Sequence, residues 1–185
     1  MRNIFLISIV FFAAPLFAAD NKPADNKPAD NKTFTEPGKF SIGLPEEGFQ
    51  WKKLQDIKIG NVTGAMYICA SPTGKSMAIL TSIQEKFESD KGRKEFCESA
   101  YKSLIQSLQS GKGQVIEDTK PKLESKVPDQ VNYAFKVHNP DNSEVYCFFT
   151  AIFGKNSTQI FIKAPSESEA KDLHNKLVKS FKELE

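Results

Sequence analysis

Hydrophobic and polar positions alternate with a period of two in several segments of the chain. Residues 40–44 alternate in this way, and the turn-forming sequence PEEG follows at 45–48. Residues 64–71 and 76–84 are rich in apolar and β-branched side chains, and the turn-forming sequence PTG lies between them. This pattern predicts a first strand with a tight exit, followed by a hairpin of the other two segments.

The period changes to that of a helix after Asp90. Apolar residues recur at every fourth position, and neighbouring apolar residues widen the stripe, up to Gly111. The members of the stripe are Phe96, Cys97, Ala100, Tyr101, Leu104, Ile105 and Leu108. Asp90 is a good N-cap and Gly111 a good C-terminal residue, so the sequence predicts an amphipathic helix between them.

Strand-like patterns return in the C-terminal half. A short strand is expected at 114–117, and residues 131–138 alternate cleanly between apolar and polar side chains. Residues 144–153 are apolar at both odd and even positions, which is typical of a strand covered on both faces. Another strand is expected at 158–163.

A second helix is predicted to end the chain. Ser166 followed by Glu169 matches a capping box, and an apolar stripe follows it. The stripe consists of Ala170, Leu173, Leu177, Phe181 and Leu184. Strands, helix, strands and helix in this order, with short connections between the later strands, predict an α+β domain with a largely antiparallel sheet. A strand covered on both faces favours an α/β/α layered sandwich with helices on opposite sides, the alternative being one helical side with loops on the other.

The N-terminal residues predict export. Residues 1–19 contain Arg2, an apolar run and a small-residue exit, as a signal peptide does. The DNKPA repeats that follow have almost no apolar content, so residues 20–34 are expected to form a disordered spacer and residues 35–185 a single domain. We expect a periplasmic or secreted protein without a lipoprotein cysteine and without a stable membrane span after signal removal. An uncleaved anchoring helix is the alternative.

Composition and charge exclude some partners. Without Arg2, the Lys and Arg residues outnumber the 23 Asp and Glu residues by only one. A nearly neutral chain gives no indication of nucleic-acid binding.

Three cysteines remain after the signal, Cys69, Cys97 and Cys147. An oxidising compartment favours one disulfide and one free thiol, and the candidate pairing is Cys97 with Cys147 or with Cys69. The alternative is that all three are buried thiols. A catalytic thiol is not indicated, because the chain lacks a Cys-x-x-Cys motif and a recognisable Cys–His arrangement.

No motif for catalysis, a cofactor or a metal is found in the sequence. The sequence Gly74-Lys75-Ser76 resembles the end of a phosphate-binding loop, but Cys69 occupies the position where that loop needs glycine. The two histidines, His138 and His174, have no neighbouring ligands at metal spacing. Catalytic residues, cofactors and metal ligands are therefore all expected to be absent.

The sequence KFSIGLPEEGFQW resembles the opening of PsbP-like domains, in which a strand of the form F-x-I-x-L-P leads through a glycine turn to an aromatic residue. The order of the later elements is similar to that superfamily, which also holds Mog-type Ran-binding proteins and envelope proteins of the DcrB type. The resemblance covers residues 35–185. It implies a PsbP-like fold and a noncatalytic accessory or binding protein.

Export and the lack of catalytic motifs together favour a binding protein of the cell envelope with a protein partner. The first alternative is a carrier of an apolar small ligand, suggested by the phenylalanines at 148, 149, 153 and 161. The second is an enzyme of unrecognised type, whose groups would converge only in three dimensions.

Overall fold

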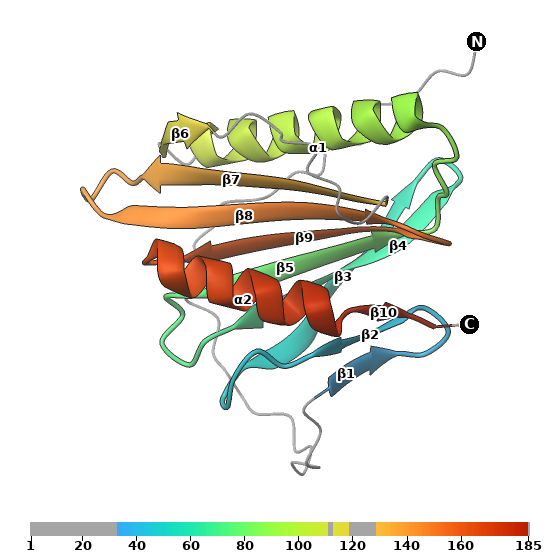
Figure 1. Ribbon diagram of the computed structural model, residues 1–185, viewed down its shortest axis with the longest axis horizontal. Helices are drawn as coiled ribbons and strands as arrows, with labels where there is room; N and C mark the ends of the chain where they lie inside the picture. The colour runs from blue at the N-terminus through green and yellow to red at the C-terminus, as the bar shows by residue number, and fades with distance from the viewer. Residues whose placement is uncertain (1–32, 111–112, 119–128, 185) are drawn as a thin grey trace.

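The computed structural model describes residues 33–110, 113–118 and 129–184. Within these residues, seven strands form a large sheet in which every neighbouring pair is antiparallel. The order across this sheet is β3-β4-β5-β9-β8-β7-β6 (Figure 1). Its strands are β3 (Gln50–Ile59), β4 (Val62–Ala70), β5 (Met77–Ile83), β6 (Gln114–Asp118), β7 (Gln130–His138), β8 (Glu144–Phe153) and β9 (Ser157–Ala164). The expected α+β class with mostly antiparallel strands is confirmed.

A small three-stranded sheet joins the two ends of the described chain. It consists of β1 (Thr33–Glu36), β2 (Phe40–Gly43) and β10 (Lys182–Glu183), with β2 in the middle. Strand β1 begins at Thr33, so Thr33 and Phe34 belong to a strand and not to the spacer that was expected to reach residue 34. The remainder of that spacer and the predicted signal at 1–19 lie outside the described residues.

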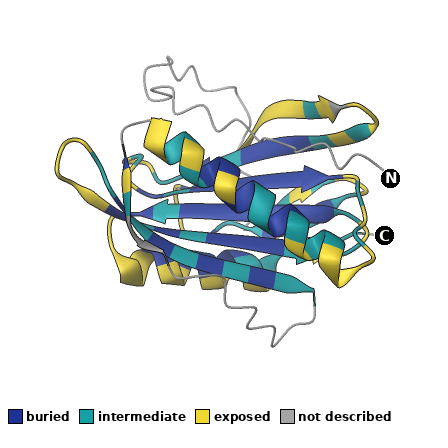
Figure 2. Cartoon of the chain, turned by 90° about the horizontal axis from the view of Figure 1, so that it is seen from above, coloured by how far each residue is buried: buried dark blue, intermediate teal, exposed yellow. Residues whose placement is uncertain are grey.

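The two helices pack on opposite faces of the large sheet (Figure 1). Helix α1 (Asp90–Ser110) covers one core, which contains Phe149 and Cys147 of β8. Helix α2 (Glu167–Ser180) packs on β8, β9 and β2 and covers the other core. Alternate residues of β8 belong to the two cores, as its two-sided apolar pattern predicted. Figure 2 shows buried residues along the middle strands and exposed residues at the turns and outer helix surfaces.

The small sheet covers a group of aromatic side chains. Tyr67 of β4 is fully buried, and its ring centroid lies 5.3 Å from Phe40 and 5.5 Å from Phe34. Phe34 also contacts Trp51, and Phe40 stacks on Phe181 with centroids 5.8 Å apart. These contacts anchor the small sheet on the large one, because fully buried aromatic rings contribute large apolar areas.

Helix α2 ends earlier than its stripe predicted. Its last residue is Ser180, and Phe181 is a C-cap in extended conformation whose N–H bonds to Leu177. Leu184 follows β10 and its N–H bonds to the carbonyl of Lys39. Placing Phe181 and Leu184 in the helix was therefore wrong. The backbone leaves the helix there because residues 182 and 183 pair with β2.

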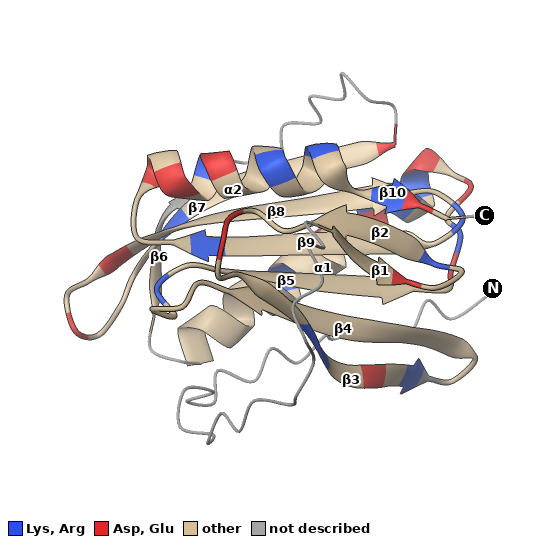
Figure 3. Ribbon diagram, turned by 90° about the horizontal axis from the view of Figure 1, so that it is seen from below, with Lys and Arg blue, Asp and Glu red and all other residues tan. Residues whose placement is uncertain are grey.

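The start of α2 forms half of the expected capping box. The hydroxyl of Ser166 accepts a hydrogen bond from the backbone N–H of Glu169 at 3.3 Å. The carboxylate of Glu169 accepts a hydrogen bond from the hydroxyl of the buried Ser76 instead of returning to the cap. Acidic residues gather at the first turn of α2 and basic residues towards its end (Figure 3), an arrangement that favours the helix dipole.

Among the described residues, no helix is both long and apolar enough to cross a membrane.

Candidate functional site

The candidate site is a row of half-buried side chains on the face of the sheet that carries α2. We call it the β7–β8 shelf and define it as Asn132, Lys136, Tyr146, Phe148 and Ile152. Strict alternation along β7 and β8 places these residues on one face, while their sequence neighbours enter the core under α1. The three apolar members pack against the edge of the core under α2 but stay partly exposed.

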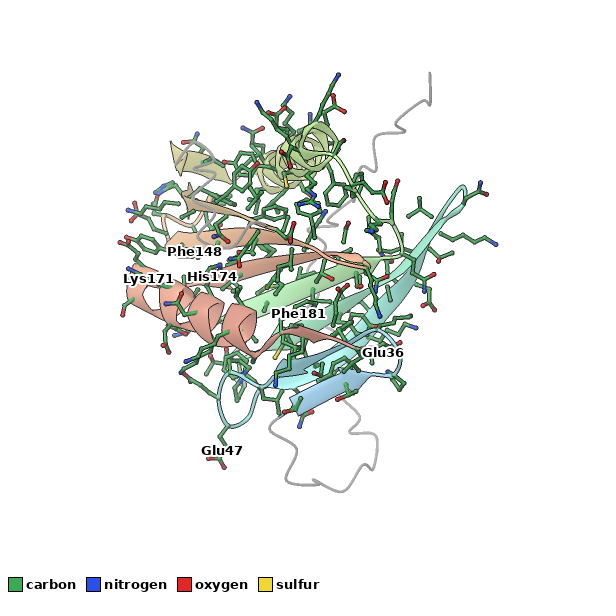
Figure 4. The ribbon with its side chains drawn as sticks, turned by 45° about the vertical axis from the view of Figure 1, so that its right-hand side comes forward. Glu36, Glu47, Phe148, Lys171, His174 and Phe181 are labelled. Atoms are coloured by element: carbon green, nitrogen blue, oxygen red, sulfur yellow. The ribbon has the colours of Figure 1, made fainter. Side chains whose placement is uncertain are left out.

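One end of the shelf is built against α2. The ring of Phe148 lies 5.2 Å from that of His174, with an angle of 32° between the planes. Lys171 lies three residues before His174, so the two residues are neighbours on one side of α2. The side chain of Lys171 is exposed. Figure 4 shows Phe148, Lys171 and His174 together at this side of α2.

A buried hydrogen-bond network lies beneath this end of the shelf. The hydroxyl of Thr150 donates to Oδ1 of Asn132 at 2.8 Å, and the side-chain amide of Gln130 donates to the same oxygen at 2.8 Å. Nε2 of His174 lies 2.5 Å from the Thr150 hydroxyl oxygen. Because that hydroxyl gives its proton to Asn132, it accepts from His174 in the tautomer that carries the ring proton on Nε2.

Burial controls the protonation of His174. The residue is 9% exposed, and burial lowers the pKa of its imidazole below the ordinary 6.5, although a hydrogen bond with Asn175 opposes this effect. Loss of water disfavours the charged ring. The ring is therefore neutral at pH 7. It joins α2 to the sheet and is largely shielded from a substrate in solution.

At the other end of the shelf, an ion pair lies beside an aromatic ring. The ammonium of Lys136 contacts the carboxylate of Glu144 and lies 5.3 Å from the ring centroid of Tyr146. The Glu144 hydrogen bond is the largest cause that raises the pKa of Lys136. Lys136 thus stays positively charged, and its charge is already matched by a carboxylate.

The three cysteines are buried free thiols in the structure. Burial raises the pKa of each to about 12, which keeps them protonated and poorly nucleophilic at neutral pH. Cys97 and Cys147 belong to the core under α1, whereas Cys69 belongs to the core on the other face of the sheet. Of the two expected pairings, only Cys97 with Cys147 joins residues of one core. A disulfide between them stays a prediction.

The phenylalanines that suggested a ligand carrier do not form one group. Phe149, Phe153 and Phe161 lie in the core under α1, and Phe148 lies on the opposite face in the β7–β8 shelf. The phosphate-loop resemblance at Lys75 falls in the turn between β4 and β5, and a strand follows it. Among the described residues, no group of three or more His, Cys, Asp or Glu side chains is placed to hold a metal ion.

The shelf and its network were missed by sequence reasoning. Asn132, Thr150 and His174 come from three elements and share no spacing that the chain could reveal. Two weak signals exist: Thr150 interrupts an apolar strand, and His174 lies four residues after Ala170, on the buried side of its helix.

Comparisons with known proteins identify neither a family nor a function for the chain. No family model matches the chain, and no curated protein matches it. Among solved structures, the chain is similar to a protein from Bacteroides thetaiotaomicron VPI-5482, with 10% sequence identity and a TM-score of 0.49. The match covers 85% of this chain and 50% of the other, so the chain spans half the length of that protein. A likeness at this level bears on neither family nor function.

Proposed function

We propose that this protein is an exported, noncatalytic accessory or binding protein of the cell envelope, periplasmic or secreted, which holds a protein partner on the β7–β8 shelf. The observation that carries this proposal is the half-buried state of Tyr146, Phe148 and Ile152, three large apolar side chains on one face of β8. Aromatic side chains at such positions are typical centres of protein interfaces, because a partner can complete their burial.

The chemistry of the described residues supports binding over catalysis. The thiols are buried with raised pKa values, and the Thr150–His174 pair is enclosed between α2 and the sheet. A nucleophile needs access to its substrate and an activated form, and these groups have neither. The polar members of the shelf are the amide of Asn132, which bonds Gln130 and Thr150, and the ammonium of Lys136, which pairs with Glu144.

We also propose that the domain is PsbP-like, with an α/β/α layered sandwich. The sequence KFSIGLPEEGFQW includes β2 and leads into β3, and the order of strands and helices agrees with that resemblance. The two helices on opposite faces of the large sheet support the layered arrangement. Accessory binding is what this family resemblance implies.

Site-specific photo-crosslinking in the native envelope tests the function. A photoreactive residue at Asn132 is expected to give a protein adduct, whereas the same residue at Lys102, exposed on α1 and on the opposite face, is expected to give none. Adducts at both positions, or at neither, would contradict a partner site on the shelf. Robust turnover by the purified protein in a hydrolase screen, abolished by one polar substitution, would overturn the noncatalytic assignment.

A carrier of an apolar small ligand is the second candidate, favoured by the same half-buried aromatic residues. Native mass spectrometry of protein purified gently from its own envelope separates the two. A stoichiometric small-molecule adduct that Phe148→Ala removes would favour the carrier. A bare mass together with a crosslinked protein partner favours the accessory role.

A further inference from the structure

We propose a second interaction surface at the β3 edge of the large sheet, where an extended acidic segment of another protein adds a strand beside β3. Strand β3 lies at one end of the strand order, whereas β7 and β8 lie near the other end, so this surface is separate from the β7–β8 shelf. Main-chain hydrogen bonds would hold the segment, and lysines of β3 would select its charge.

Strand β3 is a long edge strand. It has ten residues, and among the described residues it pairs with β4 alone. The strand at the opposite edge, β6, has only five residues. Short edge strands prevent unwanted pairing in many proteins, and β3 lacks this protection. Residues 52–56 of β3 are all exposed, and they include the apolar Leu54, which is 38% exposed.

Two residues of β3 direct their backbone groups away from β4. The β3–β4 hairpin closes through a two-residue turn at 60–61, so the pair beside the turn is hydrogen-bonded and the next pair, Lys58 with Thr63, is not. The carbonyl of Thr63 accordingly accepts a hydrogen bond from the N–H of Gln84, on the β5 side. The N–H and C=O of Lys58 therefore point to the open side of β3. Those of Asp56 do so as well, because the direction alternates along a strand.

The side chains of β3 carry an unmatched positive charge. Lys53 pairs with Asp56 at 2.6 Å. Lys52 and Lys58 are exposed, and among the described side chains neither has a carboxylate within ion-pair distance. Their partners in β4 are Ile68 and Thr63, which belong to opposite faces of the sheet, so an added strand meets one unmatched lysine on each face. Figure 3 shows basic segments on both sides of an acidic one along β3.

This charge determines which occupant fits the edge. Carboxylates on both faces of an extended segment complement Lys52 and Lys58, since opposite charges on neighbouring strands attract. The exposed Leu54 and the half-buried Ile57 offer apolar contacts to the other side chains of the segment. A second copy of β3 is a poorer occupant, because it brings three lysines and one aspartate of its own.

Fluorescence anisotropy with blocked, dye-labelled peptides of equal length tests this proposal. The first peptide repeats Glu-Glu-Thr-Val, which places Glu on both faces of a strand, and the second has Lys in place of Glu. The third is the acidic peptide with N-methyl groups on its central residues, so it keeps the charge but loses the backbone donors. We expect saturable binding of the first peptide alone, because only this peptide has both the charge and the donors.

Charge reversal in the protein tests the role of the lysines. The double variant Lys52→Glu/Lys58→Glu should weaken binding of the acidic peptide at least about tenfold, because two attractions become repulsions. The double variant Lys102→Glu/Lys171→Glu changes the net charge equally at exposed positions on the two helices, and it should leave the affinity unchanged.

A proline at the edge tests the backbone ladder. Asp56→Pro removes an N–H that points outward, whereas Asp56→Ala removes the same carboxylate and keeps the N–H. The proline variant should bind the acidic peptide about tenfold more weakly than the alanine variant does. The N-methylated peptide makes the same test on the unchanged protein, so the result does not depend on the folding of Asp56→Pro.

Three outcomes would overturn the proposal. They are the absence of binding by the acidic peptide, equal affinity for the acidic and basic peptides, and equal affinity for the acidic peptide and its N-methylated form. A concentration-dependent dimer that Asp56→Pro abolishes, and that the acidic peptide does not dissociate, would assign the edge to a second copy instead. Crosslinking at Asn132 reports on the β7–β8 shelf alone, so failure at β3 is distinguishable from failure of the proposed function.

Discussion

Nε2 of His174 lies 2.5 Å from the hydroxyl oxygen of Thr150, and this contact joins helix α2 to strand β8 in the middle of the chain's C-terminal half. Both residues are buried, and Thr150 is fully so. In the tautomer with its proton on Nε2, the neutral ring donates, the hydroxyl accepts and the network is complete. Protonation would place an unmatched charge beneath α2.

Acid should therefore destabilise the protein through His174. Burial lowers the pKa of this histidine in the folded state below the 6.5 of the unfolded chain. Below about pH 6.5 the unfolded state binds the proton more readily, so the stabilisation is fully present above that pH and is lost as the pH falls towards the folded-state pKa. Urea unfolding between pH 5 and pH 8 measures this slope. His174→Gln should flatten it, whereas His138→Gln, at a residue outside the network, should keep it.

Thr150→Val should cost about 1–3 kcal/mol, because the nearly isosteric valine keeps the packing but removes the hydroxyl that bonds both His174 and Asn132. The free energy of unfolding at pH 7.5 measures the loss. Thr73→Val, in the exposed turn between β4 and β5, should change it by less than about 0.5 kcal/mol. Equal losses in the free energy of unfolding for the two substitutions would show that the network stabilises the protein no more than an exposed turn hydroxyl does.

Glu183 should stabilise the turn between β8 and β9. Its carboxylate accepts hydrogen bonds from the backbone N–H groups of Lys155 at 2.9 Å and Asn156 at 2.8 Å. Glu183→Ala should cost about 1–2 kcal/mol. A Cβ on Gly154 would lie 2.0 Å from Oε2 of Glu183, so Gly154→Ala must displace the same carboxylate. A double-mutant cycle by urea unfolding should find the two losses strongly non-additive, and simple addition would contradict the shared contact.

Two glycines should respond in opposite directions to alanine. A Cβ on Gly64 would lie 2.4 Å from the backbone carbonyl oxygen of Ser82, which cannot move without disturbing β5. Gly64→Ala should therefore destabilise the protein by about 1–3 kcal/mol. Gly92 lies within α1, and its nearest obstacle is the hydroxyl of Ser89 at 3.2 Å, which accepts a hydrogen bond from the Gly92 N–H at 3.1 Å. A shift of a few tenths of an ångström relieves the contact and keeps this hydrogen bond, so Gly92→Ala should stabilise by up to about 1 kcal/mol. Thermal unfolding of both variants checks the signs.

The thiols should resist modification in the native protein. Burial raises the pKa of Cys69, Cys97 and Cys147 to about 12, so native protein at pH 8 should react with iodoacetamide far more slowly than free cysteine. Mass spectrometry after unfolding without reductant then counts the thiols in protein from its own compartment. Label on Cys69 alone identifies the Cys97–Cys147 bridge, and label on all three excludes it.

Much of the fold follows from local pattern. The alternation of residues 131–138 predicted β7 because one face of that strand enters a core, and the apolar stripe after Asp90 predicted α1. The expected N-cap was wrong by one residue: Asp90 is the first residue of α1, and the hydroxyl of Ser89 accepts the capping hydrogen bond from the N–H of Gly92. Half of the capping box at Ser166 formed for a similar local reason. Its other half did not form, because Glu169 finds a partner in Ser76, which is distant in sequence.

The rest depends on contacts between distant segments. Strand β1 has four residues and exists through its pairing with β2, and β10 has two and ends α2 at Ser180 by the same means. The candidate site is of this kind as well. Asn132 and Thr150 meet through the register of β7 with β8, and His174 joins them only because α2 crosses that point of the sheet.

The small sheet has a mechanical consequence. Strands β1 and β10 both run antiparallel to β2 on either side of it, with the N-terminal end of the described chain entering at one end of this sheet and the C-terminal end leaving at the other. A force that pulls these ends apart acts along the strands, so it shears the hydrogen bonds of both ladders together and does not peel them one at a time. A domain held by its N-terminal extension would thus resist tension through the short strand β2.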